Sequence, residues 1–131
     1  MTSLQLHCDL PSAKEPVFNA WLNQFQQGAI TQALAFITPE VNGKIELWNG
    51  AVLGRFLQIE KHKRLVLSWR TVDFDENLPD TTLFLHFQDI PTGSRFIVQH
   101  ENIPLNMLNQ FRFAWEKVYF PNLQAYFSHS G

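Results

Sequence analysis

The chain has 131 residues and a formal net charge of −2, from ten Lys and Arg against twelve Asp and Glu, and this balance argues against a nucleic-acid partner because such partners select a basic surface. Its single cysteine excludes an internal disulfide, and no apolar run approaches the roughly 18 residues that cross a membrane. Since the N-terminus also lacks the basic and apolar pattern of a signal peptide, we expect one cytoplasmic domain, residues 1–131, with no membrane partner.

The N-terminal third predicts one strand and two short helices. Leu4, Leu6 and Cys8 alternate with polar residues, which is the pattern of a strand. Ser12 and Glu15 have the spacing of a capping box, and apolar residues at helical spacing follow, so we predict a helix over residues 13–25. A glycine at position 28 then interrupts the pattern, and a second short helix is predicted over residues 29–34.

Residues 44–102 have the alternation of antiparallel strands separated by turns. Asn49-Gly50 predicts a two-residue hairpin, residues 61–64 form a charged tip, and residues 73–80 form an acidic loop at the opposite end of the strand between them. Alternation also places His100 with its apolar neighbours on the inner face of the sheet and His86 on the outer face. Those two histidines are therefore not expected to share a metal.

Residues 105–127 carry the longest helical signal. Its apolar stripe comprises Leu108, Phe111, Trp115, Val118, Tyr119, Leu123 and Tyr126. Pro121 lies inside it and is expected to kink or split the helix, because proline lacks the N–H that the helix needs. Together the segments indicate an α+β fold: about six antiparallel strands curved around a long C-terminal helix, with two short helices after the first strand.

A set of short motifs occurs in order along the chain: Val17-Phe18, the stretch 41–45, Asn49-Gly50, Gly54, the stretch 63–66, Trp69-Arg70, His100, the stretch 115–120 and Leu123. In these residues the chain resembles the activator of Hsp90 ATPase homologue family of the START/helix-grip superfamily, and most of all the C-terminal domain of the eukaryotic co-chaperone. The resemblance covers about residues 5–128 and implies the helix-grip fold. Ala114 departs from the glycine that many relatives have before the corresponding tryptophan.

The aromatic residues suggest a first function, which is the binding of a small apolar ligand without catalysis. Twelve Phe and four Trp are many for a small core, and a helix-grip resemblance implies a cavity between sheet and helix. The residues expected to line it are Phe56, Trp69, Phe87, Phe96, His100, Phe111, Trp115 and Tyr119, with His100 as a polar contact. A fully packed core is the competing interpretation, and a cavity of a few hundred Å³ would decide for the ligand.

The resemblance also implies a second function, a co-chaperone-like module that binds an Hsp90-type chaperone and stimulates its ATPase. The candidate contact is the basic tip, Lys61, Lys63 and Arg64, or else the acidic loop. The competing interpretation is a solvated tip that keeps the sheet edge from pairing with other chains. Arg70 is expected to hold a carboxylate or a backbone oxygen at the rim of the sheet, which is a structural role.

Catalytic and metal-binding motifs are not found in the sequence. No two histidines have the HxxxH spacing, there is no nucleophile elbow or phosphate loop, and Cys8 has no evident activating base. We therefore expect neither enzymatic activity nor a cofactor. A monomer and a homodimer both remain open, because an open sheet leaves edges.

Overall fold

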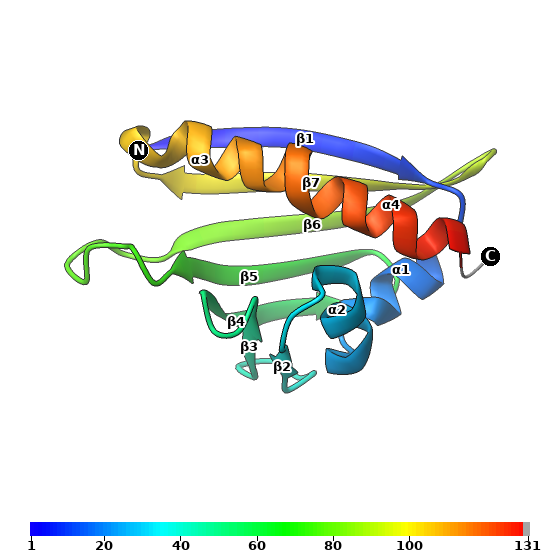
Figure 1. Cartoon of the computed structure of the whole chain (residues 1–131), viewed down its shortest axis with the longest axis horizontal. Coiled ribbons are helices and arrows are strands. Elements are labelled where there is room, and N and C mark those ends of the chain that lie inside the picture. Colours follow the sequence, from blue (N-terminus) through cyan, green and yellow to red (C-terminus); the bar gives the residue numbers. More distant parts are fainter. Residues whose placement is uncertain (130–131) are drawn as a thin grey trace.

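The computed structural model describes residues 1–129 of the chain. It consists of a seven-stranded antiparallel sheet with helices across one face (Figure 1). The strand order is β1-β7-β6-β5-β4-β3-β2, so the first strand lies beside the last and the others follow in chain order. The strands are β1 (Thr2–Leu10), β2 (Phe36–Ile37), β3 (Lys44–Leu47), β4 (Val52–Glu60), β5 (Arg64–Thr71), β6 (Thr81–Ile90) and β7 (Gly93–Ile103). The sequence predicted about six strands and did not reveal β2, because its two residues are too few to show alternation.

Two short helices follow β1, as expected, but they break at a different place. They are α1 (Lys14–Ala20) and α2 (Gln24–Thr31), so the predicted helix over residues 13–25 is wrong, and the glycine at position 28 lies inside α2. The break is caused by Asn23, whose side-chain oxygen accepts hydrogen bonds from the backbone N–H groups of Phe25 and Gln26 at 3.0 Å each. Such an N-cap starts a new helix.

The capping box predicted for Ser12 and Glu15 does not form. The first helix has Ala13 at its N-cap position without a side-chain cap, and the backbone N–H of Lys14 instead donates to the carboxylate of Asp89 at 3.2 Å. Asp89 belongs to β6, 75 residues away. The cap is therefore supplied by the tertiary structure rather than by the local sequence.

The C-terminal helix runs through η1 (Leu105–Met107), α3 (Leu108–Phe113), the π-helical segment η2 (Ala114–Tyr119) and α4 (Phe120–His129), and it lies across the sheet (Figure 1). Apolar residues recur every four positions from Phe111 to Phe127. In a regular α-helix each such step drifts about 40° around the axis, so the residues would leave the sheet. The wider π turn reduces that drift, and the N–H of Phe120 reaches back to the carbonyl of Trp115.

This π turn also changes the expected stripe and the effect of the proline. The helix is not split, because Pro121 directly follows the widened turn. Both Tyr119 and Phe120 are buried as a result, although they are adjacent. The buried residues of the helix are Met107, Phe111, Trp115, Tyr119, Phe120, Leu123 and Phe127, whereas the predicted Leu108, Val118 and Tyr126 are only half-buried.

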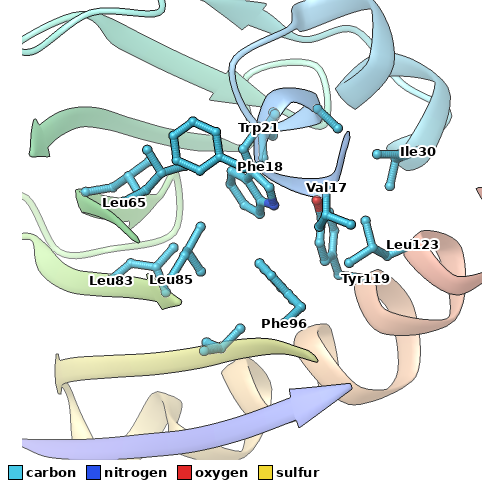
Figure 2. Packing of buried hydrophobic residues seen from close by; sticks show 14 of the residues in the cluster. Val17, Phe18, Trp21, Ile30, Leu65, Leu83, Leu85, Phe96, Tyr119 and Leu123 are labelled. Carbon is cyan, nitrogen blue, oxygen red and sulfur yellow. The ribbon is translucent and has the colours of Figure 1, made fainter. Parts of the chain in front are cut away.

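The core fills the space between the inner face of the sheet and the helices. Figure 2 shows Trp21, which directly follows α1, meeting Phe96 of β7 and Tyr119 of the C-terminal helix. Phe18 of α1 packs against Phe87 of β6 in the same layer. Trp115 is 5% exposed and points into this layer, as the predicted architecture requires. In the part of the chain that the structure describes, no helix is both long and apolar enough to cross a membrane.

Candidate functional site

A small apolar pocket lies where the C-terminal helix meets the ends of β4 and β5. Its volume is about 70 Å³, and it is partly open to solvent. Ligand sites for drug-sized molecules are about 300–1,000 Å³, so the pocket is several times smaller than the cavity that the ligand hypothesis required. Its lining consists of Trp48, Val52, Trp69, Thr71, His100, Gln110, Phe111, Ala114, Trp115 and Tyr119.

Five of the eight residues predicted to line a ligand cavity do line this pocket: Trp69, His100, Phe111, Trp115 and Tyr119. The other three, Phe56, Phe87 and Phe96, lie in the packed core away from it. Sequence reasoning missed the wall formed by Trp48, Val52, Thr71, Gln110 and Ala114. The Asn49-Gly50 pair indicated a turn near this wall, but it did not indicate that the Trp48 side chain would face the pocket.

Trp48 forms one wall from a strained turn. Residues 48–51 connect Leu47 to its cross-strand partner Val52, so the loop has four residues and the predicted two-residue hairpin is wrong. Trp48, Asn49 and Gly50 have φ values of 51°, 58° and 86°. The left-handed region costs a bulky residue roughly 1–2 kcal/mol, so other contacts must hold the turn.

Two sets of contacts hold this turn. Asn49 and Leu34 exchange hydrogen bonds, with Asn49 N–H donating to the carbonyl of Leu34 at 3.0 Å and Leu34 N–H donating to the Asn49 side chain at 2.8 Å. The Trp48 ring packs edge-on against Tyr119, with centroids 5.9 Å apart. The wall is therefore fixed before anything binds.

His100 forms the polar floor of the pocket and is fully buried. The indole N–H of Trp115 donates to His100 Nδ1 at 3.2 Å, and His100 Nε2 lies 2.7 Å from the hydroxyl of Thr81. That hydroxyl donates to the carbonyl of Trp69 at 2.6 Å, so the imidazole is neutral, carries its proton on Nε2 and donates it to Thr81. Burial lowers the pKa of His100 to about 3, which keeps the ring neutral.

This chain of hydrogen bonds changes the role expected for His100. Both ring nitrogens are used inside the protein, so an occupant of the pocket would meet the face of the imidazole rather than a free polar atom. The ring itself stacks on Phe111, with centroids 5.0 Å apart. The network links the helix to three neighbouring strands and makes the floor rigid.

Tyr119 is held in a similar way at the inner end of the pocket. Its hydroxyl donates to the side-chain oxygen of Gln27 at 3.0 Å, and the Gln27 amide donates to the carbonyl of Ala20 at 3.1 Å. Complete burial raises the pKa of Tyr119 well above its usual value, so it stays protonated. Gln27 thereby connects the pocket to α2.

An exposed carboxylate, Asp73, stands at the rim of the pocket. It accepts hydrogen bonds from two pocket-lining side chains, Thr71 and Gln110, the latter at 2.9 Å. These bonds lower the pKa of Asp73, so it is ionised near neutral pH. Next to it, Phe74 is buried and stacks on Phe111 at 5.8 Å.

Arg70 has the structural role that the sequence suggested. Its guanidinium binds the carboxylate of Asp80 at 2.6 Å and the carbonyls of Asp75 and Leu78 at 3.1 Å each. It also lies over the ring of Phe74, 5.3 Å from the centroid. One side chain thus ties down the acidic loop that follows β5.

The basic tip between β4 and β5 offers fewer free charges than expected. Lys61 and Lys63 are exposed, but Arg64 is turned back to Glu60 and Gln58. His62 has a φ of 63° and packs edge-on against Phe18 at 5.4 Å. The tip and the acidic loop do lie at opposite ends of β5, as predicted.

The remaining titratable residues do not form a reactive cluster. His86 lies on the outer face, paired across strands with Arg64 and Ile97, and its pKa is lowered by partial burial and by Arg64. Burial raises the pKa of Cys8 to about 12, which makes it a poor nucleophile. Within residues 1–129 no three metal-ligating side chains gather at one point.

Comparison with known proteins identifies relatives of this chain. The model of a family described as "Activator of Hsp90 ATPase homolog 1-like protein" matches residues 12–128. The human activator of 90 kDa heat shock protein ATPase homolog 1 is 24% identical over 118 residues, which are 90% of this chain and 35% of the human protein. The chain therefore spans about a third of the length of the curated relatives it matches.

Solved structures show the same fold. An HSP90 activator from Plasmodium falciparum superposes with a TM-score of 0.88 at 22% identity and covers 95% of both chains. A protein from Mesorhizobium loti superposes with a TM-score of 0.82 at 13% identity over 99% of both.

Proposed function

The chain belongs to the activator of Hsp90 ATPase homolog 1-like family, and from this membership we propose that it is a non-enzymatic module that binds an Hsp90-type chaperone and stimulates its ATPase. The observation that carries the proposal is the match over 95% of both chains to a protein described as an HSP90 activator. The small volume of the pocket supports it, because about 70 Å³ leaves little room for a whole ligand.

The basic tip is the surface proposed to contact the chaperone. Lys61 and Lys63 project from the end of a hairpin that is fixed to α1 through the contact of His62 with Phe18. Neither ammonium group has an ion pair within residues 1–129, so both are available to carboxylates of a partner. Exposed charges of this kind act mainly on the association rate and lose strength as salt is added.

The test is an ATPase assay with a bacterial and a eukaryotic Hsp90-type chaperone, each with increasing amounts of the purified chain. We expect saturable stimulation of hydrolysis in at least one of them. The double variant Lys61→Glu/Lys63→Glu should need about tenfold more protein for the same stimulation, as expected when two charged contacts become repulsive. The matched control is Lys44→Glu/Lys117→Glu, which makes the same change of charge at exposed sites elsewhere.

The possible outcomes test the chaperone-binding function separately from the choice of the basic tip as its contact surface. The absence of both stimulation and binding with either chaperone refutes the proposed function. Equal weakening by the two double variants leaves the module but rejects the tip as its contact, because only net charge would then matter.

A small apolar ligand is the second candidate function, and the observation in its favour is the almost entirely apolar lining of the pocket. A ligand of ordinary size would have to displace the wall at Trp48 or the helix at Ala114. Native mass spectrometry of the purified chain tests this. A discrete added mass that is lost on denaturation supports a ligand, and the mass of the chain alone, with no uptake of added apolar dyes, rejects it.

A further inference from the structure

We infer that the apolar pocket is a socket for one aliphatic side chain of a partner protein, carried on a basic segment of that partner that lies along the acidic rim formed by Asp73, Asp75 and Glu76. This inference goes beyond chaperone binding, because it specifies the chemistry of a docking segment whichever protein carries that segment.

The size of the pocket fits a side chain. A single water molecule needs about 10–15 Å³ of cavity volume, so a volume of about 70 Å³ corresponds to roughly five heavy atoms. That is enough for the branched end of a leucine, isoleucine or valine, and too little for a lipid or an aromatic metabolite. Since the lining is apolar and His100 has no free nitrogen, the socket selects for a group that needs no hydrogen bond.

The charge around the mouth selects the rest of the segment. Asp73, Asp75 and Glu76 are all exposed, and no ion pair is formed by any of them within residues 1–129. Asp80, the fourth carboxylate of the loop, is neutralised by Arg70. Among these carboxylates, Asp73 accepts hydrogen bonds from two side chains of the pocket lining, so the negative rim begins beside the socket, and Asp75 and Glu76 follow along the same loop. A lysine or arginine beside the aliphatic residue of the partner segment would complement this negative rim.

The socket and its rim are held in place from several sides. The wall at Trp48 is kept in a strained conformation by Asn49 and Tyr119, and the floor is fixed by the hydrogen bond from Trp115 to His100. The loop that carries the rim is tied down by Arg70. A preorganised site loses less conformational entropy on binding, which suits the capture of a single side chain.

The experiment uses a library of random heptapeptides displayed on phage and selected against the full chain. We expect the enriched peptides to share a leucine, isoleucine or valine with lysine or arginine within three positions. A synthetic peptide of the most enriched sequence should change the tryptophan fluorescence, because three of the four tryptophans line the pocket. Replacing its aliphatic residue by alanine should weaken binding by about tenfold or more, from the loss of the buried carbons.

Two matched variants locate the site. Ala114→Leu fills the mouth of the pocket from the helix and should abolish binding, whereas Asn109→Leu adds the same side chain at an exposed helical position outside the lining and should have no effect. The double variant Asp75→Asn/Glu76→Gln should weaken binding several-fold and reduce its dependence on salt.

A measurement on the wild-type chain keeps the test independent of folding. In NMR spectra the peptide should shift the indole N–H signals of Trp48, Trp69 or Trp115 and leave that of Trp21 in place, because only Trp21 lies outside the lining. Enriched peptides that lack cations, binding that survives Ala114→Leu, or the absence of any peptide that moves those signals would overturn the inference. If Ala114→Leu still stimulates a chaperone, the proposed function stands without the socket.

Discussion

Replacing His100 by leucine tests the buried hydrogen-bond network beneath the pocket. In the wild type the imidazole accepts the indole proton of Trp115 and donates to Thr81. Leucine has a similar size but cannot accept a proton, so the buried N–H of Trp115 loses its partner. An unpaired buried donor costs about 1–3 kcal/mol, and we expect His100→Leu to lower the free energy of unfolding at pH 7 by about 2 kcal/mol.

The same variant should change how stability depends on pH. Burial lowers the pKa of His100 from 6.5 to about 3 in the folded state, so between these values only the unfolded chain binds the proton. The contribution of His100 to stability is therefore fully present above pH 6.5 and falls as the pH is lowered, by roughly 3 kcal/mol at pH 4.5, because each pKa unit corresponds to about 1.4 kcal/mol. Leucine removes this loss, so wild type and variant should be about equally stable at pH 4.5.

Urea unfolding followed by tryptophan fluorescence at several pH values between 7 and 4.5 measures both effects. Asp9 and Asp73 have lowered pKa values and act mainly below this range. The control is His86→Gln on the outer face. This substitution removes a histidine that is only partly buried, so most of the change in unfolding free energy with pH should remain. Parallel curves for wild type and His100→Leu would refute the reasoning, because the titration would then belong to other groups.

Two further substitutions test other contacts by urea unfolding. Tyr119→Phe leaves the side-chain oxygen of buried Gln27 without its donor and should cost about 1–3 kcal/mol, and no change would mean that water replaces the hydroxyl. Gly54→Ala places a Cβ 2.2 Å from the carbonyl oxygen of Ser68 and should lower the free energy of unfolding by about 3 kcal/mol. The control is Gly28→Ala, whose added Cβ would lie 3.2 Å from the carbonyl oxygen of Ala33 and should change the free energy of unfolding by less than about 1 kcal/mol. Equal effects of the two substitutions would contradict the close approach of β4 and β5 at Gly54.

Alternation along the strands predicted correctly where individual side chains would point. It placed His100 inside and His86 outside, because a strand turns successive residues to opposite faces. The structural role of Arg70 also followed from its position at the end of a strand, beside Trp69 at the rim of the sheet. These predictions succeeded because each depends on a few residues that are close in sequence.

Predictions that depend on distant partners failed. The cap of α1 comes from Asp89, and the wall at Trp48 depends on a turn that Leu34 holds. The split between α1 and α2 was missed for a different reason, because the local N-cap signal of Asn23 was not recognised within the apolar helical pattern. The helix stripe was predicted correctly at Phe111, Trp115, Tyr119 and Leu123. It missed Phe120 and Phe127, because periodicity assumes regular turns and the π turn shifts the phase.

Hydrophobic periodicity was enough to predict the antiparallel strands, the long C-terminal helix and the aromatic side chains of both, because it states which face of each element is buried. The curvature of the sheet around the helix came from the family resemblance. The pocket of about 70 Å³ and its charged rim could be found only from the packed structure. The volume left between two packed layers depends on how rings from residues far apart in the chain fit together, and that fit has no signature in the local sequence.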